Sequence, residues 1–283
     1  MTMPHGESVD PGTPAIELCA VTKRFAAARG VPYTALRDLN LTVADGEFCA
    51  IVGPTGCGKS TTLTLIAGLE RPSAGSVSVH GRRVDGVPPG VGFMFQTDAI
   101  LPWKTVLENV AAGPRFRGTP KRTAFDAARD WVRRVGLAGF EDRYPHQLSG
   151  GMRKRAALAQ HLINEPRIIL MDEPFSALDV QTRAIMSNEL LTLWDLTRPA
   201  VVFVTHDLEE AIALADRVVV LTAGPGGTVK NVFTIDLPRP RVVQEIRFDP
   251  HFVHLYHLIW EALRVEVDIA YAQSTATHPK QAS

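Results

Sequence analysis

The sequence predicts an α/β protein built around a mainly parallel β-sheet with helices on both faces. Short apolar runs rich in β-branched residues alternate with segments whose apolar residues recur at helical spacing. One such run leads at once into a glycine-rich loop and then into a helical segment, the order expected of a parallel α/β unit. Parallel strands are buried on both faces, which is why they read as continuous apolar runs.

Each element follows from this periodicity. Strands are predicted over residues 16–21, 48–52, 76–80, 91–95, 168–171, 201–204 and 218–221. Helices are predicted from the glycine-rich loop to Gly68, over 105–136 with breaks at Gly113–Pro114 and at 118–120, from the N-cap Ser149 to 163, over 180–196 and over 208–215. The stretch at about 104–163 interrupts the alternation of strand and helix, so we expect it to form a helical subdomain.

Composition limits the function classes. The 283 residues are enough for one large or two modest domains, and 45% hydrophobic with 21% charged residues is typical of a globular protein. Thirty basic residues balance thirty acidic ones, which gives no indication of a nucleic-acid partner. Cys19, Cys49 and Cys57 form no C-x-x-C pair, so we expect no disulfide framework or zinc ribbon and a reducing cytoplasm.

The two ends of the chain differ from its middle. Residues 1–14 are rich in Pro, Gly and polar residues and lack a signal-peptide pattern, so we predict a disordered tail. No apolar run approaches the ~18 residues that span a bilayer, so any work at a membrane requires a partner. Residues 241–283 form a predicted helical extension, either packed on its own domain or serving as a regulatory or dimer-contact helix. Its apolar positions are Phe252, Leu255, Tyr256, Ile259, Trp260 and Leu263.

Three histidines in this extension raise the question of a metal site. His251, His254 and His257 are spaced by three residues, so together they sweep around a helix. Zinc sites usually need three or four convergent ligands, and no cysteine supports these histidines. We therefore favour ordinary surface histidines.

The glycine-rich loop matches G-x-x-x-x-G-K-[ST], a phosphate-binding pattern. Glycines let backbone N–H groups wrap closely around phosphates, and the following helix contributes its positive end. Lys59 is expected to reach the outer phosphates and Ser60 to ligate Mg²⁺. Because Cys57 lies inside this loop, a thiol reagent that labels it is expected to block ATP binding. The predicted nucleotide-binding residues here are Gly53, Pro54, Thr55, Gly56, Cys57, Gly58, Lys59, Ser60 and Thr61.

Polar residues that end other strands complete the predicted catalytic site. Asp172 suits Mg²⁺ binding and Glu173 suits activation of the attacking water, because an apolar run precedes both and Pro174 follows. His206 is either a donor to the outer phosphate or a structural histidine at a strand end. Gln96, taken alone, is a polar loop residue.

In chain order, these motifs resemble the nucleotide-binding subunits of ABC transporters. The specific element is Leu148-Ser-Gly-Gly-Met152, which P-loop kinases and GTPases lack, and Ser176-Ala-Leu-Asp179 follows the acidic pair. The resemblance covers about residues 16–240 and implies an ABC ATPase domain over 15–240. It implies a RecA-like P-loop NTPase core with an antiparallel β-subdomain and a helical signature subdomain.

The resemblance also implies roles for the matching positions. ATP with Mg²⁺ would lie between two head-to-tail copies of the chain, and the homodimer would drive integral membrane permease subunits at the cytoplasmic face of the membrane. A periplasmic or extracellular solute-binding protein would act indirectly. The implied contacts are Phe25 on adenine, Gln96 on Mg²⁺ and water, Ser149, Gly150 and Gly151 on the other copy's γ-phosphate, Asp179 at the dimer seam and His206 on the γ-phosphate.

Details refine the resemblance and depart from it. Met152 stands where Gln is usual, and Gln160-His161 stands where Arg-Ala is common. Neither change removes a group assigned to phosphate chemistry, so we expect activity to survive. Finer likeness to importers of the nitrate/sulfonate/taurine type comes from Leu101-Pro-Trp103 with Val106 and Asn109-Val110, from Ser149-Gly-Gly-Met-Arg153 and from Leu237-Pro-Arg-Pro-Arg241.

Two other function classes stay open at this point. One is a soluble ABC-type ATPase acting on nucleic acid or the ribosome, which usually has two fused cassettes or a long coiled coil; the sequence has one cassette and no sustained heptads. The other is a P-loop kinase or switch GTPase, which the Leu-Ser-Gly-Gly element and the lack of an Asn-Lys-x-Asp sequence disfavour.

Overall fold

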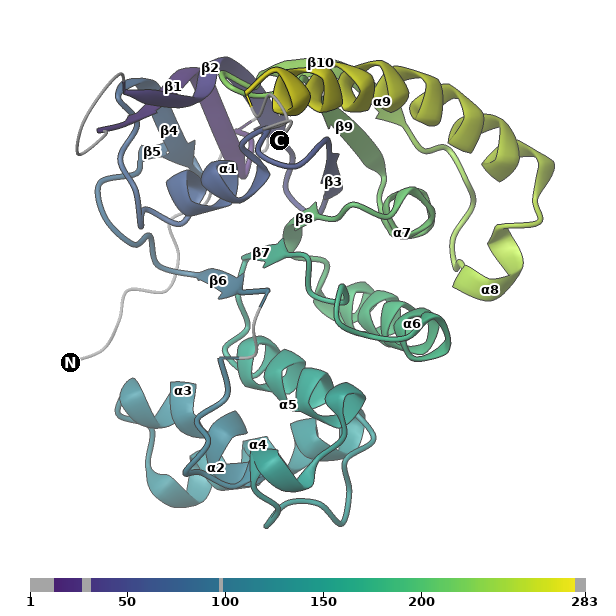
Figure 1. Ribbon diagram of the computed structural model, residues 1–283. Coiled ribbons are helices and arrows are strands. Elements are labelled where there is room, and N and C mark those ends of the chain that lie inside the picture. Colours follow the sequence, from purple (N-terminus) through teal and green to yellow (C-terminus); the bar gives the residue numbers. More distant parts are fainter. Residues whose placement is uncertain (1–12, 27–31, 97–98, 278–283) are drawn as a thin grey trace, which may run out of the picture.

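The computed structural model describes residues 13–26, 32–96 and 99–277, so most of the predicted tail lies outside the described residues. The predicted α/β fold is confirmed. The large sheet contains β3 (Phe48–Val52), β6 (Val91–Met94), β7 (Ile168–Asp172), β8 (Ala200–Val204), β9 (Arg217–Leu221) and β10 (Val229–Thr234). Its order is β10-β9-β3-β8-β7-β6, and all neighbours are parallel except β10 with β9 (Figure 1).

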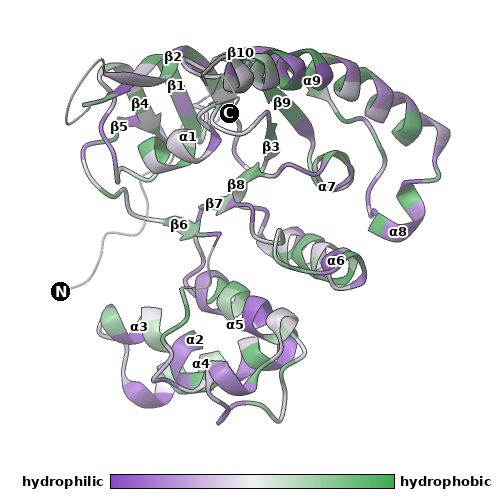
Figure 2. Ribbon diagram, viewed as in Figure 1, coloured by the Kyte–Doolittle hydropathy of each residue, from purple (hydrophilic) through white to green (hydrophobic). Residues whose placement is uncertain are grey.

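The large sheet is buried on both faces. Along β3, Phe48, Ala50 and Val52 belong to one hydrophobic cluster. The alternate residues Cys49 and Ile51 belong to the second cluster on the opposite face, as the twofold repeat of a strand requires. The strands are coloured mainly as hydrophobic in Figure 2. This burial explains the continuous apolar runs that predicted the strands.

A smaller antiparallel sheet covers the helix that follows the glycine-rich loop. It has the order β2-β1-β4-β5, and the second cluster joins its side chains to those of helix α1 (Lys59–Ile66). The sequence analysis did not predict strand β2, whose buried residues alternate with exposed ones. The strands are β1 (Ile16–Phe25), β2 (Tyr33–Val43), β4 (Ala74–Val79) and β5 (Arg82–Arg83).

The predicted helical subdomain is present and lies at the bottom of Figure 1. It contains α2 (Val106–Val110), α3 (Ala112–Phe116), α4 (Lys121–Arg134), the 3₁₀ helix η1 (Pro145–Gln147) and α5 (Gly150–Leu162). The break predicted at Gly113–Pro114 lies two residues earlier, at Ala111 between α2 and α3. Both residues lie inside α3, because proline is tolerated in the first turn of a helix, where its N–H would be unpaired. The predicted break at 118–120 is confirmed between α3 and α4.

The remaining helices cover the large sheet. They are α6 (Val180–Thr197), α7 (Leu208–Leu214), α8 (Val243–Ile246) and the long C-terminal helix α9 (Pro250–Thr277). Phe252, Leu255, Ile259 and Leu263 of α9 join the main hydrophobic cluster, so this helix packs on its own domain. Trp260, by contrast, is 41% exposed. Among the described helices, none is both long and apolar enough to cross a bilayer.

Candidate functional site

The glycine-rich loop connects β3 to α1, as predicted. Gly56 and Gly58 have φ values of +80° and +101°, which favour glycine, and a Cβ on Gly58 would collide with the side chain of Leu36. The Lys59 ammonium donates to the carbonyl oxygens of Gly53 at 2.8 Å and Pro54 at 3.1 Å. The lysine therefore lies across the loop, with its charge held over the cradle.

An oxygen pair lies beside the loop. The Asp172 carboxylate at the end of β7 lies next to Ser60 at the start of α1. Burial raises the pKa of Asp172, and the Ser60 side chain opposes that rise. In the described part of the chain, no three His, Cys, Asp or Glu side chains gather as a metal site. The pair fits Mg²⁺, which commonly uses one or two protein oxygens and completes its shell with phosphate oxygens and water.

The structure brings Gln96, Glu173 and His206 together. Glu173 Oε2 accepts a hydrogen bond from Gln96 Nε2 at 3.3 Å and lies 3.3 Å from His206 Nδ1. The three residues follow β6, β7 and β8, which are neighbouring parallel strands, so their carboxyl ends meet at one edge. Glu173 itself has φ +44°, a costly conformation for a residue with a side chain and one that concentrates at functional sites.

Residues that the sequence analysis missed hold the His206 segment. Thr205 Oγ1 donates to buried Glu210 at 2.7 Å and accepts from the Asp207 N–H at 3.0 Å. Arg183 of α6 donates to Asp207 at 2.8 Å and lies 3.5 Å from Glu210. Burial raises the pKa of Glu210 to about 7. Sequence spacing gives no signal for Arg183, because α6 meets this segment only in the folded chain.

The signature segment and Asp179 lie close to each other and apart from the phosphate loop. Ser149 is the N-cap of α5, with its exposed hydroxyl accepting from the Met152 N–H at 3.3 Å. Gly151 packs against Thr182, which donates to the Asp179 carboxylate at 2.6 Å. Figure 1 places α5 in the helical subdomain and α1 beside the small sheet, well separated. A phosphate-binding role for Ser149 therefore points to a nucleotide held by another copy.

Phe25 lies at the end of β1, next to the phosphate loop. It pairs across the small sheet with Tyr33, whose hydroxyl donates to the Gly56 carbonyl at 3.1 Å. The Lys23 ammonium lies 4.9 Å from the centre of the Phe25 ring. The sequence analysis did not identify Tyr33, because its place depends on the pairing of β1 with β2.

The two departures from the usual family pattern are structural contacts. His161, in α5, lies 2.8 Å from the Phe93 carbonyl oxygen through Nε2. Lys154, which lies in the same helix, donates to the Gln96 carbonyl at 3.0 Å. Met152 is partly buried and packs against the main hydrophobic cluster. The signature helix is thus tied to the strand that carries Gln96.

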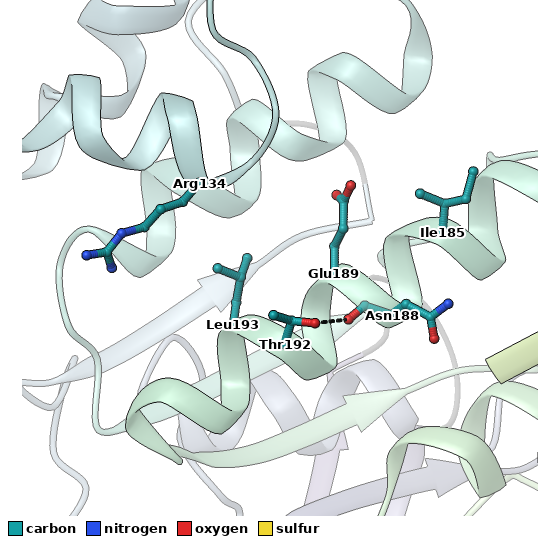
Figure 3. Close-up of a pocket in the computed structure, with 6 residues that line it drawn as sticks. All are labelled: Arg134, Ile185, Asn188, Glu189, Thr192 and Leu193. Atoms are coloured by element: carbon teal, nitrogen blue, oxygen red, sulfur yellow. Dashed lines mark hydrogen bonds between the residues drawn. The ribbon is translucent and has the colours of Figure 1, made fainter. Parts of the chain in front are cut away.

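A hollow of about 260 Å³ lies elsewhere, at the seam of α4 and α6 (Figure 3). Arg134 lines it from α4, and residues of α6 such as Glu189 line it from the other side. No residue of the phosphate loop borders it. We therefore place the functional site at the strand ends, where the phosphate loop and the polar cluster meet, and not in this hollow.

Comparisons with known proteins agree with this geometry. Residues 36–176 match the family described as ABC transporter. An uncharacterized ABC transporter ATP-binding protein, MJ0412 of Methanocaldococcus jannaschii, is 50% identical over 214 residues, 76% of this chain and 80% of the relative. The nitrate import ATP-binding protein NrtD of Synechocystis sp. is 42% identical over 79% of this chain and 83% of the relative. The bicarbonate transport ATP-binding protein CmpD of Synechococcus elongatus is 40% identical over 83% of this chain and 85% of the relative.

A solved structure gives the same answer. The dimeric ATP-binding cassette MJ0796, in a post-hydrolysis state bound to ADP and Pi, superposes with a TM-score of 0.69 at 31% identity. The match covers 79% of this chain and 100% of that one. The fold, the phosphate loop and the relatives lead to one conclusion: the chain belongs to the ABC transporter family as an ATP-binding subunit, and it is an ATPase.

Proposed function

We propose that this chain energises import of a small nitrate-, sulfonate- or taurine-like solute by hydrolysing ATP in a head-to-tail dimer. The observation that carries the proposal is the convergence of Gln96, Glu173 and His206 at the strand ends beside the phosphate loop. Polar groups from three strands meeting there suit activation of one water molecule next to a phosphate.

Each residue has a part in this chemistry. The loop from Gly53 to Thr61 cradles the phosphates with its N–H groups, and Lys59 leaves its loop carbonyls to bind the outer phosphates. Ser60, Asp172 and Gln96 would hold Mg²⁺, which supplies charge neutralisation when bound. Glu173 takes a proton from the attacking water.

The groups around this centre complete the proposed site. His206 donates to the γ-phosphate, and the segment held by Arg183 and Glu210 keeps it in place. Phe25 stacks on adenine, since it lies beside Tyr33 and Gly56 at the edge of the loop.

The partner copy supplies the rest of the site. Ser149, Gly150 and Gly151 present a hydroxyl and the N-terminus of the 13-residue helix α5, where backbone N–H groups point outward. Asp179 lies at the same dimer seam, because Thr182 donates to its carboxylate and also packs against Gly151. Two such surfaces, facing two phosphate loops, form a closed pair of sites with twofold symmetry. The dimeric arrangement of the MJ0796 cassette supports this proposal.

The transport assignment rests on the relatives. The nitrate and bicarbonate subunits serve small anions, and the Leu237-Pro-Arg-Pro-Arg241 segment shares the importer pattern. We propose peripheral attachment at the cytoplasmic face through a membrane permease, with a solute-binding protein acting on the permease. We also propose that residues 15–240 form the ATPase domain and 241–283 an extension.

The substitution Glu173→Gln tests the catalytic proposal. It keeps the shape of the side chain but removes the base, so hydrolysis should fall by roughly 10² to 10⁴ while ATP binding persists. ATP should also trap the variant as a dimer, which light scattering coupled to gel filtration measures. Glu245→Gln, the same change at an exposed position of α8, is the control and should keep wild-type activity. Full activity of Glu173→Gln would refute the role of Glu173, and ATP-bound protein that stays monomeric would refute the shared site.

A further inference from the structure

The C-terminal helix contributes a buried carboxylate that the proposed chemistry does not use. Glu266 of α9 is only 6% exposed. Its Oε2 accepts from the Ala223 N–H at 2.6 Å, and its Oε1 lies 2.8 Å from the Lys230 ammonium. Lys230 also donates to the Ala262 carbonyl at 3.0 Å. A carboxylate is costly to bury, and these two partners offset that cost, so Glu266 is held in one position.

Glu266 fixes the loop between β9 and β10, residues 222–228. Thr222 and Thr228 close this loop on itself, with the Thr222 N–H donating to the Thr228 carbonyl at 2.9 Å and the Thr222 hydroxyl accepting from the Thr228 N–H at 3.0 Å. The loop is also tied to β2, because the Gly226 and Gly227 N–H groups donate to Thr34 and Ala35 at 2.7 and 3.1 Å. The β9–β10 loop is thus held by α9 on one side and by β2 on the other.

The same loop lies directly against the backbone of the phosphate loop. A Cβ on Gly224 would collide with the Gly56 carbonyl, and a Cβ on Gly227 would collide with the Cys57 carbonyl. These close approaches explain why glycine occupies both positions. The β9–β10 loop therefore packs directly behind the segment Gly56–Cys57 of the phosphate loop and forms its back wall.

We propose that Glu266 is a positioning residue for nucleotide binding: through Ala223 it holds the β9–β10 loop against Gly56 and Cys57, so α9 is part of the ATP site. The inference rests on the proposed nucleotide site. Phosphate binding by backbone N–H groups depends on their being aimed before the ligand arrives, because any ordering on binding reduces affinity. A loosened wall lets the phosphate loop relax and weakens binding of ATP.

An electrostatic effect supports this proximity. Burial raises the pKa of the Cys57 thiol, Lys59 opposes the rise, and the Glu266 carboxylate adds a smaller contribution in the raising direction. Glu266 is 209 positions further along the chain than Cys57, yet its charge lies close enough to affect a residue of the phosphate loop.

The effect should fall on binding and spare the chemical step. Glu173 and His206 sit at the ends of β7 and β8 and have no contact with α9 in the described interactions. We expect Glu266→Ala to raise the Kd and KM for ATP about tenfold, the scale of a buried donor left unpaired, with kcat changing less than about twofold. Lys230→Met, which keeps the Ala223 hydrogen bond, should raise KM less.

The experiment uses the full chain and measures ATP binding by titration, steady-state hydrolysis and the thermal midpoint. Glu266→Gln is the mild variant that still folds, because its amide oxygen can accept from Ala223. Glu261→Gln, an exposed glutamate on the same helix, is the matched control and should leave Kd, KM and kcat unchanged. A second readout is the rate at which a thiol reagent labels Cys57 in a Cys19→Ser background. It should rise in Glu266→Ala more than in Glu266→Gln, because both variants remove the carboxylate charge that raises the pKa of Cys57 but only the alanine loses the acceptor for Ala223.

The outcomes separate the possibilities. A raised KM with near-normal kcat and faster labelling of Cys57 supports the inference. A lowered thermal midpoint with unchanged Kd, KM and labelling means that Glu266 stabilises the fold only, and the inference is overturned. A wild-type chain that neither binds nor hydrolyses ATP would overturn the proposed function itself, whatever the Glu266 variants do.

Discussion

Glu210 lies beside the His206 segment, and its ionisation should make the protein less stable as the pH rises from 4.5 towards 7. The carboxyl group is buried, and burial raises its pKa from 4.5 to about 7, against the opposing hydrogen bond from Thr205. The charged groups that face it are Arg183, Asp207 and His206. Below pH 4.5 the group is protonated in both the folded and the unfolded chain.

The magnitude follows from the two pKa values. Between pH 4.5 and about 7, only the folded chain keeps the proton, so the free energy of unfolding falls as pH rises. At about 1.4 kcal/mol for each pH unit, this interval corresponds to on the order of 3 kcal/mol. The substitution Glu210→Gln imitates the protonated group and should remove this loss. The gain of about 3 kcal/mol in the free energy of unfolding is an upper value, because the variant also loses the contact of Glu210 with Arg183 at 3.5 Å.

Urea unfolding of wild type and Glu210→Gln at several pH values between 4 and 8.5 measures the effect. The two free energies should agree near pH 4 and diverge as pH rises, with the variant more stable by up to about 3 kcal/mol above pH 7. Taking the difference cancels the titrating groups that do not interact with Glu210. Glu209→Gln, on the exposed side of the same helix, controls for the loss of a charge. A difference that does not vary with pH, or a wild type favoured at high pH, would show that the reasoning is wrong.

The remaining predictions concern the phosphate loop and the end of the ATPase domain. Cys57 and Cys49 are buried and Cys19 is exposed, so native protein should show one fast thiol with Ellman's reagent, and Cys19→Ser should remove it. Fast labelling of Cys57 would contradict this. A reagent that does reach Cys57 is still expected to block ATP binding. Arg241 is 6% exposed and donates to carbonyls at the end of α7, including that of Ala215 at 2.7 Å. Arg241→Met should therefore lower the free energy of unfolding by about 3 kcal/mol, and unchanged urea unfolding would count against it.

Much of the fold and of the site could be predicted where the signal is local. The seven predicted strands are present within a few residues. Strands β3, β7, β8 and β9 are buried along nearly their whole length, and a strand buried on both faces is a continuous apolar run in any tertiary setting. The phosphate loop was predictable for the same reason: its eight-residue pattern contains its own conformational requirement, seen in the positive φ of Gly56 and Gly58. Strands β2, β5 and β10 were not predicted; all three lie at sheet edges, and their residues are exposed, partly buried or alternately buried.

The Arg239–Arg241 segment has one meaning in the sequence and another in the structure. Sequence offered it as a sign of subfamily, and its side chains turn out to make internal contacts. Arg239 pairs with Asp216 at 2.7 Å, and Arg241 caps carbonyls of α7. The segment thus anchors the chain that precedes α8 to the helix that follows His206.

Most of the helices and strands, the phosphate loop, the order of the motifs and hence the family could be predicted from the amino-acid sequence alone. Each element and the loop depend on residues a few positions apart, whose spacing is fixed by the backbone. The folded chain was needed to show that Gln96 and His206 both lie at the Glu173 carboxylate, and that Glu266 contacts the loop behind Gly56. Those contacts join residues tens to hundreds of positions apart, and strand order and register, which side-chain packing selects, bring them together.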